Sequence, residues 1–471
     1  MKPNQSKGGN PVHQTVAEKI QFESAGQSIQ IEFTDQQLSP HAGTATFWSF
    51  VHESGWRELV ARCLPHPAPT SNNALSPVTK VLGFVQGLLC GAKKLTHCAY
   101  LRRDPMMPAL LGIKRVPSQS TFTRFFQGFT GAGKNLACFR PLFAWGMQKL
   151  PAKNEGYALD FDSTRLLHED GHQEGVEVGY TRVGTKPCLH PLLAIFSEAR
   201  LVGGFWLRPG NCSCANNVVG FFLDLWDNLP SHVRLRVVRA DSGFYVAELL
   251  HLWEQLGVKF IVVARLTQPV QSLLRRETRW LPTGLDGTEV AELEYEAPDL
   301  PATARFVAIR HRLKDKRSRA GGKLLIDCPG YLYQVLVTNQ PRTVPLVDIW
   351  RDYNGRAACE NVIKELDAGY GLPDLVCKDF WATEAALSFG VIAHNLIVLF
   401  EHKLGWQEAV TLGTLRYWLF VTAGIISRPQ GQMTIKLAVP THERDWWRGL
   451  WDKLLSPNPN CNAVGTRPAF A

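Results

Sequence analysis

The 471-residue sequence has little that would bind zinc, cross-link cysteines or cross a membrane. Its eleven cysteines are scattered, and Cys212 and Cys214 are the only close pair, so neither a disulfide framework nor a zinc-ligand pattern is apparent. The first residues are polar and lack the apolar core of a signal peptide. The most apolar run, 385–400, is shorter than a membrane span of about 20 residues. We therefore expect reduced thiols, a cytoplasmic location and a buried helix over this run.

Acidic residues are almost absent from one part of the chain. Residues 75–150 contain eleven Lys or Arg and a single acid, Asp104, while the whole chain has a net charge of +9. A segment so poor in carboxylates favours contact with the phosphates of a nucleic acid over a merely solvated surface. The candidate contacts in this segment are Lys114, Arg115 and Arg124.

Residues 1–150 are predicted to form a helical basic region behind a polar, mobile arm of about 40 residues. A helical pattern covers 47–70, and a Pro- and Ser-rich linker follows at 66–77. Ser118 or Ser120 is placed to cap a short helix that carries Arg124. A helix–turn–helix and a plain helical bundle with basic decoration both fit this pattern, and the sequence does not choose between them.

Strand patterns begin after Gly156. Strands are predicted at 157–162, 190–196, 201–207, 233–238 and 258–264, and helices at 216–229 and 245–257. The first three strands are consecutive, which favours antiparallel pairing, whereas each later strand follows a helix, which favours parallel pairing. The fold class is therefore α/β, with a mixed sheet flanked by helices.

The remaining segments complete the predicted domain organisation. Residues 151–264 form the first part of the central domain, and 265–338 form a β-rich insertion that ends in a strand at 331–339. A long helix from about Pro345 to Asp367 belongs to the last part, 339–400. Residues 401–471 form a helical C-terminal region, which we expect to serve dimerisation.

Three carboxylates stand out on this framework. Asp162 ends one predicted strand and Asp241 follows another, so parallel strands would bring both to the same sheet edge. Glu360 lies on the predicted long helix, on a face shared with Arg356, Lys364 and Asp367 and beside an apolar face. The alternative for Glu360 is a surface pair with Lys364 at i,i+4, worth about 0.3–0.5 kcal/mol.

Three carboxylates suit phosphodiester chemistry. Two hard cations can activate a water and stabilise the leaving oxygen, and Mg²⁺ prefers oxygen ligands such as Asp and Glu. Zinc would instead favour a ligand set built on His168 and His172, or on Cys212 and Cys214. Neither pair is accompanied by a second pair of ligands that would complete a zinc site.

Asp160 competes with Asp162 for the first position of the site. The two residues lie two apart on one strand and share a face, so alternation does not distinguish them. Asp162 is nearer the carboxyl end of its strand, as Asp241 is in relation to its own. Asp160 lies deeper, where an unpaired charge would be costly to bury, so we predict Asp162 as the ligand.

The sequence resembles the DDE transposases of bacterial insertion sequences, in the subgroup with a β-rich insertion before the glutamate. The resemblance rests on five stretches in order, at 159–164, 179–196, 238–245, 337–339 and 353–371. The subgroup signature of Tyr, Arg, Glu and Lys is matched by Tyr353, Arg356 and Glu360, but Asp367 stands in the lysine position.

The resemblance implies a ribonuclease H-like fold and cut-and-paste transposition, in which the enzyme cleaves the terminal inverted repeats of double-stranded DNA and joins them to a target. It implies that Asp162, Asp241 and Glu360 are catalytic and hold Mg²⁺, for which Mn²⁺ can substitute. Tyr353 and Arg356 would contact transposon-end phosphates, with Lys364 replacing the missing lysine. A homodimer is the expected active form. The alternatives are a nuclease without strand transfer and a non-catalytic DNA-binding relative.

Overall fold

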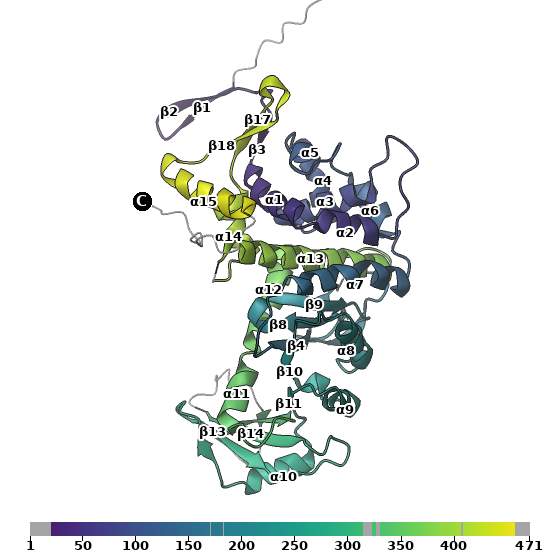
Figure 1. The fold of residues 1–471 in the computed structure, drawn as a ribbon, viewed down its shortest axis with the longest axis vertical. Helices are drawn as coiled ribbons and strands as arrows, with labels where there is room; N and C mark the ends of the chain where they lie inside the picture. The colour runs from purple at the N-terminus through teal and green to yellow at the C-terminus, as the bar shows by residue number, and fades with distance from the viewer. Residues whose placement is uncertain are drawn as a thin grey trace, which may run out of the picture.

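The chain is built around one large mixed sheet and one long central helix (Figure 1). The structure is a computed structural model that describes residues 20–169, 171–181, 183–313, 323–325, 330–406 and 408–456. In Figure 1 the sheet fills the lower half, and α13 and α7 run across the middle. The N-terminal helices and the C-terminal elements lie together above them, so the two ends of the described chain share one side of the molecule.

The large sheet has the strand order β12-β13-β14-β16-β11-β10-β4-β8-β9, with β15 paired to β16. Its strands are β4 (Tyr157–Ser163), β8 (Leu192–Phe196), β9 (Leu201–Trp206), β10 (Leu235–Ala240), β11 (Phe260–Val263), β12 (Leu281–Pro282), β13 (Thr288–Leu293), β14 (Arg305–Arg312), β15 (Lys323–Leu324) and β16 (Tyr331–Thr338). The strands predicted from the sequence pattern are confirmed. The pairing is confirmed too, because β4, β8 and β9 pair antiparallel, whereas β4, β10 and β11 pair parallel.

The strands of the 265–338 segment do not form a separate sheet. They continue the large one, because β16 pairs antiparallel with β11 and β14 pairs with β16. Among the strands that were not predicted, β5 (Leu166–Leu167), β6 (Glu177–Thr181) and β7 (Gly184–Leu189) form a small antiparallel sheet after β4. They are two to six residues long, so each gives a periodic pattern little length in which to appear.

The helices cover the sheet and build the upper half of the molecule (Figure 1). They are α1 (Ala45–Glu53), α2 (Trp56–Cys63), α3 (Pro77–Leu89), α4 (Leu95–Tyr100), α5 (Met107–Leu110), α6 (Gln119–Phe126), α7 (Ala132–Gln148), α8 (Val218–Asp227), α9 (Ala247–Gln255), α10 (Gln268–Arg276), α11 (Leu346–Asn354), α12 (Ala357–Tyr370), α13 (Phe380–Leu404), α14 (Leu412–Leu415) and α15 (Arg444–Leu455). Ser118 caps α6, since its hydroxyl accepts the amide hydrogen of Thr121.

Two helix predictions were wrong. The expected helix over 345–367 is two helices, α11 and α12, separated at Gly355 and Arg356. The pattern at 47–70 covers parts of α1 and α2, which separate at Gly55, where φ is +73°. Within the expected arm, β1 (Ile20–Ser24) and β2 (Gln27–Ile31) form a hairpin, and residues 1–19 lie outside the described residues. For both helices, the local apolar pattern continued across the point where the chain changes direction.

The two ends of the described chain are joined by a third small sheet. It consists of β3 (Leu38–Ser39), β17 (Gly424–Ser427) and β18 (Thr434–Leu437), in the order β18-β17-β3. The N-terminal segment therefore pairs directly with a C-terminal strand, a contact between residues far apart in the sequence.

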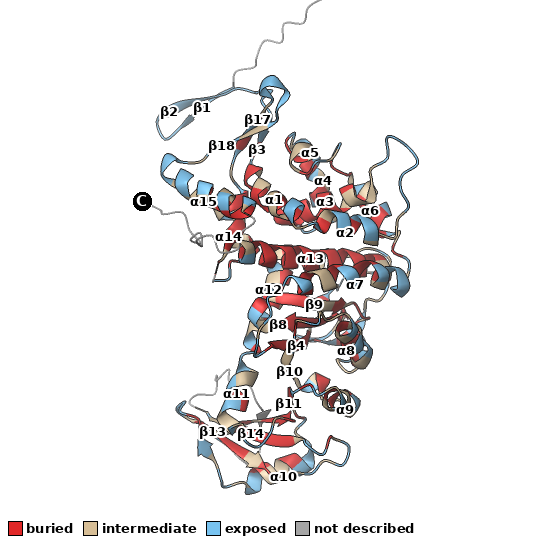
Figure 2. Cartoon of the chain, in the orientation of Figure 1, coloured by how far each residue is buried: buried red, intermediate tan, exposed pale blue. Residues whose placement is uncertain are grey.

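Helix α13 is the core of the molecule (Figure 2). It is long and apolar enough to cross a membrane by length and composition alone, but its most apolar window is entirely buried inside the protein. The prediction of a buried helix over 385–400 is thus confirmed. The N-terminal helices pack on it, because Phe125, Phe129 and Phe139 contact the ring of Phe389. A fragment ending at residue 150 would lose this shared core, so DNA binding is best tested on the full chain.

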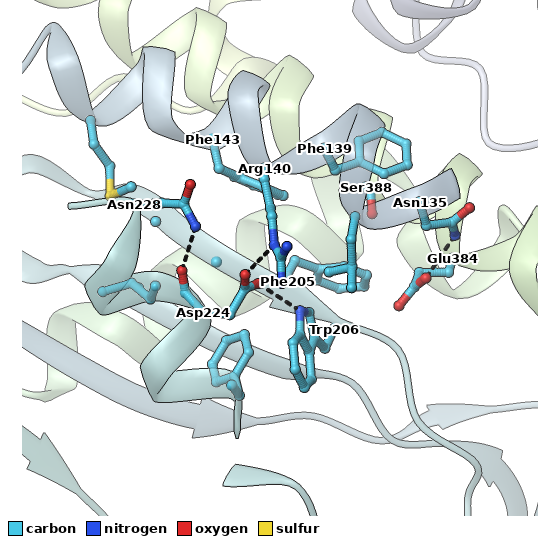
Figure 3. Close-up of a pocket in the computed structure, with 16 residues that line it drawn as sticks. Asn135, Phe139, Arg140, Phe143, Phe205, Trp206, Asp224, Asn228, Glu384 and Ser388 are labelled. Carbon is cyan, nitrogen blue, oxygen red and sulfur yellow. Dashed lines mark hydrogen bonds and ion pairs between the residues drawn. The ribbon is translucent and has the colours of Figure 1, made fainter. Parts of the chain in front are cut away.

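A buried carboxylate joins α13 to the sheet and to α7 (Figure 3). Glu384 accepts the amide hydrogen of Leu207 at 3.0 Å and the side-chain amide of Asn135 at 2.7 Å. It lies beside a small cavity of about 40 Å³. On the other side of this cavity, Asp224 binds Arg140 and Trp206. Burial raises the pKa of Glu384 to about 7, and the hydrogen bonds from Leu207 and Asn135 oppose the shift only in part.

We expect Glu384→Gln to remove a pH dependence of stability. Between pH 4.5 and 7 the folded protein holds this proton more tightly than the unfolded chain, so wild-type stability falls as pH rises through that window. The difference in free energy of unfolding between variant and wild type should therefore change by about 2–4 kcal/mol between pH 5 and 8, in favour of the variant at pH 8. Urea denaturation at both pH values measures it, and parallel pH curves for the two proteins would contradict the assignment.

Candidate functional site: carboxylates at the edge of the sheet

The carboxyl end of β4 carries the two aspartates that the sequence could not distinguish by alternation. Asp160 is fully buried and binds the Arg239 guanidinium with both oxygens, at 2.6 and 2.9 Å. Arg239 stands beside Asp160 in the parallel register of β10 on β4. A bidentate pair of this kind uses both carboxylate oxygens. Asp160 is therefore occupied by a structural ion pair.

Asp162 lies two residues further along β4 than Asp160, on the same face of the strand, and is 9% exposed. One oxygen accepts the amide hydrogen of Ser163 at 2.7 Å, and the other lies 2.8 Å from the Arg356 guanidinium. Burial raises the pKa of this carboxyl, and Arg356 opposes the shift. The negative charges of Asp241 and Glu360 raise the pKa further, so both act on Asp162 through space.

Asp241 follows the last residue of β10, which is the parallel neighbour of β4. Its side chain accepts the amide hydrogen of Gly243 at 2.8 Å and so caps the turn Ser242–Phe244. A Cβ atom at Gly243 would lie 2.7 Å from Cys214, so this close turn requires glycine. The turn holds Asp241 at the same sheet edge as Asp162.

Glu360 reaches this edge from α12. Its side chain is exposed, and it forms no ion pair with Lys364, although both residues lie in the described part of the chain. Glu360 and Asp162 instead line one cavity of about 300 Å³. The other residues around this cavity come from β4, the β5–β7 sheet and α12: Ser163, Thr164, Arg165, Leu167, Thr181, Val183, Ile363, Lys364 and Asp367.

Ion pairs across the sheet set the position of α12. Asp352, near the end of α11, accepts hydrogen bonds from Arg236 at 2.6 Å and from Arg239 at 3.3 Å. The Arg239 guanidinium also donates to the Asp352 carbonyl. A Cβ atom at Gly355 would lie 2.6 Å from a guanidinium nitrogen of Arg239. Glycine at 355 therefore lets the chain pass this arginine, and the break between α11 and α12 is anchored to β10.

The three residues near the carboxylates that were predicted to contact DNA phosphates, Arg356, Tyr353 and Lys364, differ from one another in burial. Arg356 is 8% exposed and directs its guanidinium to Asp162 and to the Phe161 carbonyl, so it faces the interior in this structure. Tyr353 is half-buried, and burial raises its pKa to about 12. Lys364 is exposed at the cavity.

Asp367, in the position where the family signature has lysine, also lines the cavity. It is half-buried, and burial raises its pKa to about 6. One of its oxygens is buried without a hydrogen-bond partner in the described residues. The cavity is therefore more acidic than the signature predicts.

The three candidates in the N-terminal region lie on a different surface. Lys114, Arg115 and Arg124 are exposed, and each donates to a nearby backbone carbonyl. Arg124 projects from α6, whose apolar face packs Phe122, Phe125 and Phe126 into the core.

The donor chemistry of the sheet-edge site fits a hard cation, because its charged oxygens come from carboxylates and no histidine lines its cavity. Among the described residues, no three His, Cys, Asp or Glu side chains are close enough together to hold one ion. Neither alternative zinc set, His168 with His172 or Cys212 with Cys214, therefore gains a third ligand among the described residues. The positive charge beside Asp162 is supplied by Arg356.

Sequence reasoning missed Arg239, Arg236 and the cavity residues of the β5–β7 sheet. The parallel pairing of β4 and β10 was predicted, but only their register in the structure places Arg239 beside Asp160. Cys214 was considered only as a metal ligand, but its sulfur lies 3.2 Å from the Ser163 hydroxyl and packs on Gly243.

The fold and site define a mixed α/β protein with acidic side chains gathered at the carboxyl ends of two parallel strands. A family model described as "Transposase DDE domain group 1" matches residues 22–456, and the chain belongs to this family. No curated protein matches the chain. It is similar to a solved structure of a piggyBac transposase synaptic complex with hairpin DNA, with 11% identity, a TM-score of 0.45, and coverage of 92% of this chain and 91% of that chain.

Proposed function

We propose that this transposase binds the terminal inverted repeats of an insertion sequence and moves it by cut-and-paste, with Asp162, Asp241 and Glu360 as its catalytic residues. The observation that carries the proposal is the shared cavity of Asp162 and Glu360, with the charge of Asp241 acting on Asp162. We also propose that β9, β8, β4, β10 and β11 form a ribonuclease H-like core, on the basis of their order and direction.

Asp162, Asp241 and Glu360 would hold Mg²⁺, with Mn²⁺ able to replace it. When bound, such ions activate a water and stabilise the leaving 3′ oxygen of a phosphodiester. The chain positions the first two carboxylates on rigid strand ends and the third on α12, which is anchored through Asp352 to Arg236 and Arg239. Because strand ends and helices are rigid, the three carboxylates keep fixed positions relative to one another.

Arg356 favours the ionised form of Asp162, because a guanidinium 2.8 Å away opposes the rise in pKa that burial causes. Its phosphate-binding role requires that it turn outward when DNA binds, and Tyr353 would then contact the same backbone. Lys364 is exposed at the cavity and would meet a phosphate that enters it. We further propose a homodimer as the active form, acting in the cytoplasm.

The proposal is tested by strand transfer. Purified full-length protein, Mg²⁺ and a labelled duplex that ends in the inverted repeat flanking the gene should join the label to a supercoiled plasmid. A nuclease without strand transfer would cleave the duplex and leave the plasmid unlabelled, and a non-catalytic relative would bind without cutting. A duplex with a scrambled end is the control, because it should bind weakly and stay intact.

A further inference from the structure

A second cavity, away from the carboxylates, is lined by basic side chains. It has a volume of about 510 Å³ and lies between α3, α6 and the segments that precede them. We call it the N-terminal basic cavity, defined by Lys80, Arg102, Arg115, Arg124, His66 and Ser118. The three arginines are exposed at its rim, and Lys80 is half-buried.

No carboxylate balances these charges. Neither Asp nor Glu lines the N-terminal basic cavity, and none of the four cations forms an ion pair with an acid in the described part of the chain. Arg115 and Arg124 donate only to the carbonyls of Asn73 and Ser120. Four cations around one hollow repel one another, and an anion between them relieves that repulsion.

The wall of the cavity is rigid and partly aromatic. The His66 ring stacks on Phe125, with centroids 4.5 Å apart, and packs edge-on against Phe129. The ammonium of Lys80 lies 5.8 Å from the centroid of the same Phe125 ring. His66 Nε2 lies 2.8 Å from the Phe125 carbonyl, to which it donates, while the buried Nδ1 has no partner among the described residues. Burial and the charge of Arg124 lower the pKa of Lys80, in keeping with the lack of a counter-charge.

We propose that the N-terminal basic cavity binds a phosphate group, held by Arg102, Arg115, Arg124 and Lys80. The chemistry is that of a phosphodiester in the DNA substrate or of a free nucleotide phosphate, and guanidinium groups suit both. The DNA source rests on the proposed function. Since α6 and α12 both pack on α13, a DNA phosphate fixed at the cavity would be held in a constant relation to Glu360.

The test compares two double variants of the full chain. Arg115→Ala/Arg124→Ala removes two exposed side chains from the cavity. Arg428→Ala/Lys436→Ala removes the same charge from exposed positions at β17 and β18. Binding to a 30-base-pair duplex is measured across a salt titration. We expect the cavity variant to bind about tenfold more weakly or worse and its log–log salt slope to shrink by about 1, since one lost phosphate contact removes about 0.9. The control should retain the wild-type slope.

Thermal shift with ATP or inorganic tripolyphosphate distinguishes the two phosphate sources. If the source is DNA, these probes leave melting unchanged while the cavity variant loses DNA affinity. If the source is a free nucleotide, the probes raise the melting temperature of the wild type but not of the cavity variant. The cavity variant and the wild type then bind DNA with equal affinity. The inference is overturned if the cavity and control variants bind DNA alike and neither probe shifts melting. Strand transfer is scored separately, so a wild type that binds through the cavity but cannot join ends would contradict only the proposed function.

Discussion

Asp162→Asn, Asp241→Asn and Glu360→Gln each lower DNA cleavage by about 10³-fold or more, while duplex binding stays within about twofold of the wild type. Each amide has nearly the shape of the acid it replaces but lacks the charge that a divalent ion needs. Binding persists because the exposed cations of the N-terminal basic cavity are not altered. The measurement is cleavage of the labelled end in Mg²⁺, together with the dissociation constant of the same duplex.

The matched control for these variants is Asp227→Asn. Asp227 is an exposed carboxylate at the end of α8 and does not line the cavity shared by Asp162 and Glu360, so its loss should leave cleavage unchanged. The assignment of the three catalytic residues would fail if any of their variants cleaved at a rate close to the wild type. It would also fail if all three lost DNA binding in parallel with cleavage, since that would indicate general unfolding.

Asp160→Asn has its large effect on stability instead of catalysis. Asp160 is fully buried against Arg239, and removing its charge leaves the buried Arg239 guanidinium with only the longer ion pair to Asp352. Breaking such a pair costs about 3–5 kcal/mol, so the melting temperature should fall by several degrees. Below that temperature the variant should retain cleavage, in contrast to Asp162→Asn, which should be inactive in both Mg²⁺ and Mn²⁺.

Two measurements separate these aspartates. Differential scanning calorimetry gives the loss of stability, and cleavage at a temperature where each variant is folded gives the activity. A folded but inactive Asp160→Asn beside an active Asp162→Asn would move the first ligand to Asp160. Arg239→Ala is the companion variant. It should destabilise the protein at least as much as Asp160→Asn, because it breaks the same pair and also removes the contacts of Arg239 with Asp352.

Much of the sheet, and the common sheet edge of the two catalytic aspartates, could be predicted from the sequence. Apolar runs and alternation placed β4, β10 and β11, and the helices between strands implied the parallel pairing that brings Asp162 and Asp241 to one edge. The apolar face of α12 was predicted as well, and Cys359, Leu366 and Tyr370 are buried. These features depend on local periodicity and on chain connectivity, which a single sequence carries in full.

Only the tertiary structure decided which charges meet. Arg356 turns to Asp162 instead of to solvent, and Asp160 is held by Arg239, because those partners are brought together by sheet register and helix docking. At the helix break, Gly355 leaves space for the guanidinium of Arg239, which comes from a strand more than a hundred residues earlier. Likewise the basic N-terminal helices share a core with α13. Local patterns fix which segments are strands and helices, whereas ion pairs depend on packing between segments distant in the chain, which no local pattern records.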